Sequence, residues 1–123
     1  MAKQCTIIKK QSSACKEQLL ALRDGLEILG GKWKLLILLY LDNRKKEQNH
    51  FKKMQREIIG ISAKMLTKEL RDLEMNFMIT RNVQTEPYMV FYALTDYGKT
   101  AIKISKDITK WGLIHRQKIK NGF

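Results

Sequence analysis

The stretch IGISAKMLTKELRDLE, residues 59–74, decides how this sequence folds. Gly60 interrupts the preceding helical pattern and Ser62 is a residue type that caps helix N-termini, so a helix should begin here and run to about Asn76. Its apolar residues recur at helical spacing on one side. They are Leu66, Leu70, Leu73 and Phe77. A helix with one such stripe is expected to bury it against a core and leave the other side in solvent.

The solvent side of this predicted helix is basic. Lys64, Lys68 and Arg71 repeat the same spacing two residues earlier, about 200° round the helix at about 100° per residue. Such long cationic side chains reach base edges and phosphates, and Ser62 and Thr67 can add hydroxyl contacts. A merely solvated charged face is the alternative, but the surrounding cations favour a nucleic-acid surface.

The charge balance of the chain supports that interpretation. Lys and Arg number 24 against 12 for Asp and Glu, so the formal net charge is +12 and the pI about 9.9. Between Lys52 and Arg71 the cations are opposed only by Glu57 and Glu69. A strongly basic balance favours a polyanionic partner such as double-stranded DNA. The 123 residues, 44% of them hydrophobic, fit a single domain with its own core.

Helical and β patterns surround the stretch in a consistent order. The segments are a tail over 1–12, helices over 13–29, 33–41 and 96–116, a helix-turn-helix over 50–76 and a β-hairpin over 78–94. A short helix, a turn, a capped basic helix and then a hairpin is the order of a winged helix-turn-helix, whose second helix enters the DNA major groove. The predicted fold class is therefore mainly α with a small β-hairpin wing and extra helices at both ends.

Apolar runs argue against export and against a membrane protein. Residues 1–10 contain no apolar core long enough for a signal peptide. The longest apolar run, residues 35–41, is far shorter than the roughly 20 residues that cross a bilayer. We therefore expect a cytoplasmic protein without a membrane partner.

The cysteines and histidines do not indicate a metal site or an enzyme. Cys5 and Cys15, in a chain without a secretory signal, are expected to be free thiols. There is no CxxC pair, and His50 and His115 are isolated, so we predict no metal and no cofactor. A thiol redox enzyme would need a resolving cysteine and an activating base, and no histidine is near either thiol in sequence.

Several separate motifs, in this order, resemble the HxlR-type winged helix regulators of bacteria. They are GGKW at 30–33, the stretch at 59–74, VFYALTDYG at 90–98 and Trp111-Gly112. The resemblance covers about Leu19 to Trp111. It implies a homodimeric transcriptional regulator whose first and last helices form the dimer interface, with two recognition helices and two wings facing DNA.

Two apolar stripes are compatible with such a dimer. They consist of Leu19, Leu22 and Leu26 in the first helix and of Ile104, Ile108 and Trp111 in the last. This is more apolar surface than a hairpin and short helices are expected to cover. The alternative is that these side chains close the core of the monomer.

The chain departs from the family pattern at the loop and at the wing. The loop over 42–50 is longer and more charged than is usual in the family, and loops tolerate such insertions. Phe91 stands where relatives usually carry glutamate, and Pro87 is the only proline. The wing tip, residues 85–88, has no cation, which leaves Arg81, Asn82 and Gln84 as its polar contacts and predicts weaker wing binding than in relatives.

Some members of this family sense oxidants through a cysteine just before the first helix. Cys15 is the candidate here, because a helix start and the neighbouring Lys16 favour a lowered thiol pKa. The family position, however, falls near Leu19 or Leu20, and an inert thiol is the alternative.

The expected function is sequence-specific binding of a pseudo-palindromic operator by a homodimer, with repression as the outcome. The expected DNA contacts are Ser62, Lys64, Met65, Thr67, Lys68, Arg71, Lys52, Lys53, Arg81 and Gln84. A winged helix that binds protein or RNA is one alternative, and a thiol-based redox sensor within the same family is another. No convergent polar set identifies a small-molecule effector.

Overall fold

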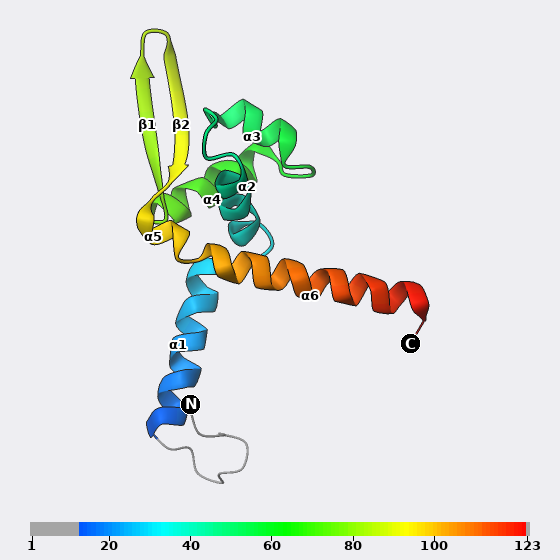
Figure 1. Ribbon diagram of the computed structural model, residues 1–123. Coiled ribbons are helices and arrows are strands. Elements are labelled where there is room, and N and C mark those ends of the chain that lie inside the picture. The colour runs from blue at the N-terminus through cyan, green and yellow to red at the C-terminus, as the bar shows by residue number, and fades with distance from the viewer. Residues whose placement is uncertain (1–12, 123) are drawn as a thin grey trace. The chain divides into compact units, whose positions relative to one another are not determined.

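The computed structural model describes residues 13–122, so the predicted tail over 1–12 lies outside the described residues. The elements are α1 (Ser13–Leu29), α2 (Lys34–Asn43), α3 (Phe51–Glu57), α4 (Ala63–Met75), β1 (Ile79–Thr85), β2 (Tyr88–Leu94), α5 (Asp96–Lys99) and α6 (Ile102–Asn121). The chain divides after Gly31 into two units, with α1 in the first and all other elements in the second. The mainly helical fold with one hairpin is the predicted fold class (Figure 1).

The first unit is the amphipathic helix α1. It ends at a pair of glycines, where the Gly30 N–H donates to the Leu26 carbonyl at 2.7 Å. A Cβ on Gly30 would lie 2.2 Å from that same oxygen, so only glycine allows this close approach. Gly31 follows with a φ of +93°, which turns the chain out of the helix.

The core of the second unit is built around α2. Its side chains Ile37, Leu38 and Leu41 are almost completely buried, but Leu36 is 42% exposed, so α2 is not enclosed on every side as its apolar pattern predicts. The other fully buried large side chains come from α3, α4 and β1 and are Met54, Leu66, Leu70, Leu73 and Ile79. The Ser105 hydroxyl donates to the Leu35 carbonyl at 2.9 Å and joins α6 to α2. Figure 1 shows α6 continuing well beyond this contact.

The hairpin carries a third short segment on its β2 edge. β1 and β2 pair antiparallel from Ile79 opposite Leu94 to Thr85 opposite Tyr88, with a tight turn at Glu86 and Pro87. An isolated bridge pairs His50 with Phe91, and the Tyr92 N–H donates to the Asn49 carbonyl at 2.9 Å. The loop before α3 is therefore part of the wing's support.

Phe77 does not belong to the buried stripe of α4, contrary to the sequence prediction. The helix ends at Met75, and Phe77 has a φ of +63° and a side chain that is 75% exposed. The Phe77 N–H donates to the Glu74 carbonyl at 3.0 Å and the Met78 N–H to the Leu73 carbonyl at 2.9 Å, the Schellman pattern that terminates a helix. Helical spacing therefore no longer applies at Phe77.

The last predicted helix, over 96–116, is interrupted in the structure. Thr95 caps α5 by accepting a hydrogen bond from the Gly98 N–H at 2.8 Å. A Cβ on Gly98 would lie 2.0 Å from the Met78 carbonyl oxygen, which shows how closely α5 approaches the start of the hairpin. The chain turns at Thr100 and resumes as α6, which reaches Asn121 rather than residue 116.

Candidate nucleic-acid interface

α3 and α4 form the predicted helix-turn-helix. Ile58 and Ile61 in the turn are buried, and Gly60 between them has a φ of +91°, a conformation that favours glycine. The Ser62 side chain accepts a hydrogen bond from the Met65 N–H at 3.0 Å, which is the predicted N-cap. The start of α4 is thereby fixed by local sequence.

α4 has the two faces that its periodicity predicts. Leu66, Leu70 and Leu73 are at most 2% exposed, whereas Lys64 and Arg71 are exposed and Met65 is half-buried. The Thr67 hydroxyl donates to the Ala63 carbonyl at 2.8 Å and keeps its acceptor lone pairs. The outward face therefore presents cations beside a hydroxyl oxygen.

The acidic residues of α4 change the charge of this face. The Glu69 carboxylate is buried and binds Lys34 of α2 at 2.6 Å, and its other oxygen lies 3.9 Å from the exposed Lys68 ammonium. Asp72 binds the exposed Lys68 at 3.1 Å, and this hydrogen bond lowers the pKa of Asp72 and raises that of Lys68. Lys68 is thus partly neutralised. Lys64 and Arg71 form no ion pair within the described part of the chain.

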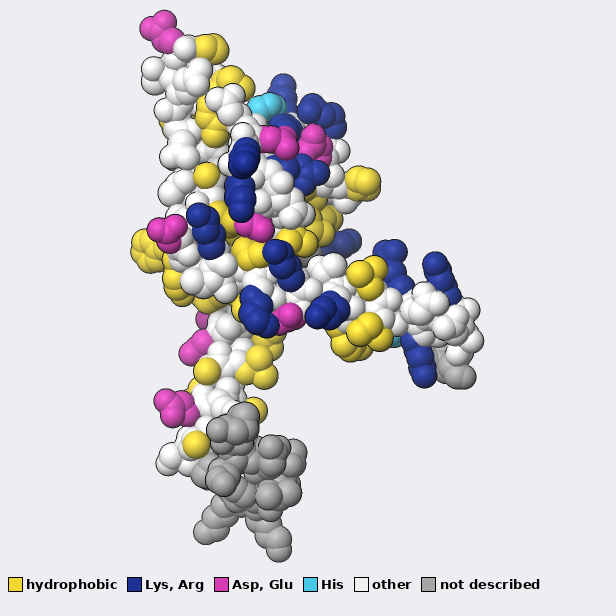
Figure 2. Space-filling view, in the orientation of Figure 1, with side chains coloured by type: hydrophobic (Ala, Val, Ile, Leu, Met, Phe, Trp, Pro, Cys, Tyr) yellow, Lys and Arg dark blue, Asp and Glu magenta, His cyan; other side chains and the backbone are white. Residues whose placement is uncertain are grey.

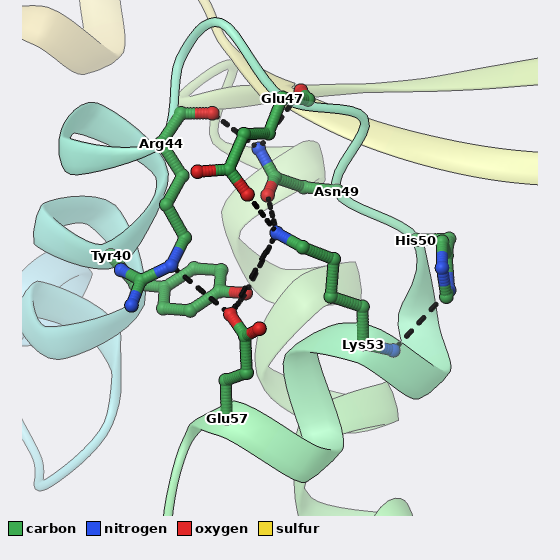
Figure 3. Close-up of polar contacts among 7 residues, drawn as sticks. All are labelled: Tyr40, Arg44, Glu47, Asn49, His50, Lys53 and Glu57. Carbon is green, nitrogen blue, oxygen red and sulfur yellow. Dashed lines mark hydrogen bonds and ion pairs between the residues drawn. The ribbon is translucent and has the colours of Figure 1, made fainter.

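Lys53 is turned inward, in contrast to the DNA contact expected of it (Figure 3). Its ammonium donates to Glu47 at 2.8 Å and to the Asn49 side-chain oxygen at 2.9 Å, and its side chain is only 15% exposed. Burial opposes the charge, but the hydrogen bond to Glu47 raises the pKa of Lys53. Two residues of the loop before α3, Glu47 and Asn49, thus bind the Lys53 ammonium. Lys52 and Arg56 on the same helix stay exposed.

Tyr40 and Glu57 complete the same cluster (Figure 3). The Tyr40 hydroxyl donates to Glu57 at 2.6 Å, and Arg44 reaches the same carboxylate oxygen at 3.1 Å. Burial and the Glu57 hydrogen bond raise the pKa of Tyr40, and the Tyr40 hydrogen bond lowers the pKa of Glu57. We name the set Tyr40, Arg44, Glu47, Asn49, Lys53 and Glu57 the loop cluster. It joins α2 and α3 to the loop.

Sequence reasoning missed Asn49, which connects the loop cluster to the wing. The residue is buried, its amide donates to the Arg44 carbonyl, and its own carbonyl accepts from the Tyr92 N–H. The charged run over 42–49 reads as a solvated loop from sequence. In the structure the end of this loop is instead fixed at Asn49, which is hydrogen-bonded to the loop itself and to β2.

The wing residues differ in how free their polar groups are. Arg81 lies opposite Tyr92, and its hydrogen bonds with Tyr92 and Tyr88 raise the pKa of Arg81. The Gln84 amide donates to the Pro87 carbonyl at 3.3 Å, so it helps to close the wing turn. The structure brings Arg81 and Arg71 to one cleft between α4 and the hairpin, whereas Gln84 lies at the wing tip.

The apolar stripe of α1 and that of α6 both expose large hydrophobic side chains. Leu19, Leu22 and Leu26 are 48–62% exposed, and Ile104, Ile108 and Trp111 are 44–63% exposed. The Trp111 ring stacks on His115 with centroids 5.1 Å apart. Figure 2 shows hydrophobic and basic side chains next to each other on α6.

The oxidation state of Cys15 differs from the sequence prediction. Cys15 is disulfide-bonded, so the expectation of a free thiol is wrong for it, because thiol oxidation state depends on the redox environment and cannot be read from spacing. Cys5 lies outside the described residues.

Within residues 13–122 no three His, Cys, Asp or Glu side chains are grouped to hold a metal ion. No helix in this range is long and apolar enough to cross a membrane.

A glycine-containing turn, a capped helix with a cationic face and an adjoining hairpin define a winged helix-turn-helix DNA-binding protein. The family model described as HxlR-like helix-turn-helix matches residues 28–120. This chain therefore belongs to the HxlR-like helix-turn-helix family, as its motifs predict. It is a transcriptional regulator of the helix-turn-helix type and not an enzyme.

Individual relatives agree with this family membership. The chain is 37% identical over 95 residues to the HTH-type transcriptional regulator YtcD of Bacillus subtilis, covering 76% of this chain and 73% of YtcD. The YtcD crystal structure superimposes with a TM-score of 0.69 at 33% identity over 78% of this chain and 96% of that one. The redox regulator HypR in its oxidized form gives 0.67 at 30% identity over 75% and 93%.

Proposed function

We propose that this protein is a homodimeric repressor that binds a pseudo-palindromic operator with α4 in the major groove. The observation that carries the proposal is the outward face of α4, where Lys64 and Arg71 are exposed. The opposite face of the helix is buried in the core. The flanking cations Lys52 and Arg56 lie on α3, where a duplex in contact with α4 would pass. Cations in these places supply phosphate contacts and base contacts together.

The dimer is supported by the exposed stripes on α1 and α6. The α1 stripe consists of leucines, and the α6 stripe combines isoleucines with the aromatic Trp111. Exposed stripes of such residues are typical of a protein interface rather than a solvated surface. A two-fold dimer would read half-sites separated by about 34 Å, one helical turn of DNA, or by a multiple of it.

The first test is binding of the full chain to a genomic fragment pool that includes its own upstream region, against excess nonspecific competitor at several salt concentrations. We expect a retained complex whose log affinity falls by roughly 0.9 per neutralised phosphate for each log unit of salt. Lys64→Ala should lower operator affinity by about tenfold, whereas Lys106→Ala on α6 removes the same charge away from the interface and should have little effect. Retention of no fragment would overturn the proposal in favour of a protein or RNA interaction module.

A redox response is a second candidate, because Cys15 is disulfide-bonded and a redox regulator is among the similar structures. Operator binding should then differ between protein treated with a thiol reductant and protein treated with a thiol oxidant. Cys15→Ser should bind equally under both conditions. Equal binding by the wild type in both states would eliminate this role.

A further inference from the structure

The cleft between α4 and the wing has a volume of about 320 Å³. Thr67, Leu70 and Arg71 line it from α4, and Arg81 and Tyr92 line it from the two strands of the hairpin. Two arginines from elements distant in sequence therefore converge on one concave surface. Thr67 and Arg71, two of its lining residues, belong to the exposed face of α4.

The two arginines are prepared to bind an anion. Arg71 and Arg81 are both exposed, and neither forms an ion pair within residues 13–122. Arg81 lies on β1 opposite Tyr92, which also lines the cleft. A guanidinium presents a rigid fork of donors that matches the oxygens of a phosphate in a bidentate way.

The position of the cleft identifies which phosphate it would meet. This step rests on the proposed function. With α4 in the major groove and the hairpin along the adjacent minor groove, the sugar-phosphate strand that separates the two grooves has to pass between these elements. The cleft lies at that place.

We infer that the cleft is a clamp for a backbone phosphodiester of DNA, formed by Arg71 and Arg81. The Thr67 hydroxyl also lines the cleft, but its proton is already donated to the Ala63 carbonyl, so the arginines supply the donors for the phosphate. Arg71 then fixes the register of the protein on the duplex and does not read a base. Base reading is left to the N-terminal part of α4, where Lys64 is exposed.

Glu74 lines the same cleft and opposes a phosphate there. It comes from the last turn of α4, so its carboxylate meets the approaching strand together with Arg71. Like charges that approach in a partly enclosed cleft repel, which lowers affinity. Glu74→Gln should therefore bind both operator and nonspecific duplex several-fold more tightly than the wild type.

The experiment compares Arg71→Ala, Arg81→Ala and the double variant on operator and on nonspecific duplex across a salt series. Each single variant should weaken both duplexes by about tenfold, reduce the salt slope by about 1 and leave the ratio of operator to nonspecific affinity unchanged. Because the two side chains would bind one phosphate, the double variant should lose less than the product of the single losses. Arg71→Lys, which keeps the charge without the fork, should fall between wild type and alanine.

Three results would overturn the clamp. One is a changed ratio of operator to nonspecific affinity for Arg71→Ala, which would mean that Arg71 reads a base. The second is fully multiplicative losses in the double variant, and the third is a salt slope equal to that of the wild type. Lys106→Ala corrects for the simple loss of one positive charge, and unfolding temperatures exclude misfolding. If the wild type prefers no duplex over competitor, the proposed function fails, yet the slopes on nonspecific duplex still decide on the clamp.

Discussion

Asn49 and Lys53 act at the scale of single residues by joining the helix-turn-helix to the wing. The Lys53 ammonium holds the Asn49 side chain, and the Asn49 carbonyl accepts from β2. Both bonds lie near the surface but are largely screened from water, since Asn49 is buried and Lys53 is mostly covered. The sequence predicts Lys53 as a DNA contact, whereas in the structure its hydrogen bonds hold the loop before α3 in place.

Lys53→Met should lower the free energy of unfolding by roughly 1–2 kcal/mol, because it keeps the aliphatic stem but removes charged hydrogen bonds. The neighbouring Lys52→Met is the matched control, since Lys52 is exposed and should contribute to DNA binding only. Urea unfolding and the salt slope of DNA binding separate the two roles. Equal stability losses in both variants would contradict this assignment.

Glu57→Gln should make stability less sensitive to acid. The Tyr40 hydrogen bond lowers the pKa of Glu57 below its ordinary value of 4.5. A carboxyl whose pKa is lowered by folding adds stability that is complete above its unfolded pKa and is lost as the pH falls through the folded pKa. The unfolding temperature of the wild type should thus fall more steeply on acidification below about pH 4 than that of the variant. Glu86→Gln at the exposed wing tip should follow the wild-type curve, and two parallel curves for Glu57→Gln would refute the linkage.

At the scale of elements, local sequence predicts where a helix lies better than it predicts which partner a charged side chain binds. The cap at Ser62 and the stripe from Leu66 to Leu73 depend on nearest turns of the same helix, so periodicity predicts α4 well. The partner of Glu69 is Lys34, which is 35 residues away, and no helical pattern reports such a pairing. The prediction that Phe77 is buried is wrong for a related reason, because helical spacing does not apply beyond the last turn of the helix.

The junction of hairpin, α5 and α6 depends on a close backbone approach that a sequence pattern does not reveal. Gly98→Ala should lower the free energy of unfolding by more than about 2 kcal/mol, since the new Cβ would meet the Met78 carbonyl. Lys99→Ala, in the same helical turn but exposed, should change it by less than about 0.5 kcal/mol. Thermal unfolding of the two variants checks this. An unfolding midpoint of Gly98→Ala equal to that of the wild type would show that the junction accommodates a Cβ without cost.

At the scale of the whole molecule, two kinds of surface are left over once each unit has formed its own contacts. One is the cationic face of α3, α4 and the wing, and the other is an exposed apolar stripe on each of the two helices α1 and α6, one in each unit. Sequence predicts that both exist, because periodicity assigns the residues to faces. Sequence alone does not say whether an apolar face closes the monomer or meets a second copy, since that depends on which side chains the other elements cover.

The exposed apolar side of α6 makes the dimer directly testable. Ile108 is 55% exposed, so Ile108→Glu should leave the fold of a single chain intact. In a dimer the new carboxylate would be buried without a partner, which is costly enough to shift the equilibrium to monomer. Sedimentation velocity should then show a monomer, and operator affinity should fall steeply, because half-sites bound separately lose the benefit of linkage. Lys106→Glu changes charge on another face of α6 and should remain dimeric. A dimeric Ile108→Glu variant with unchanged operator affinity would place the interface elsewhere.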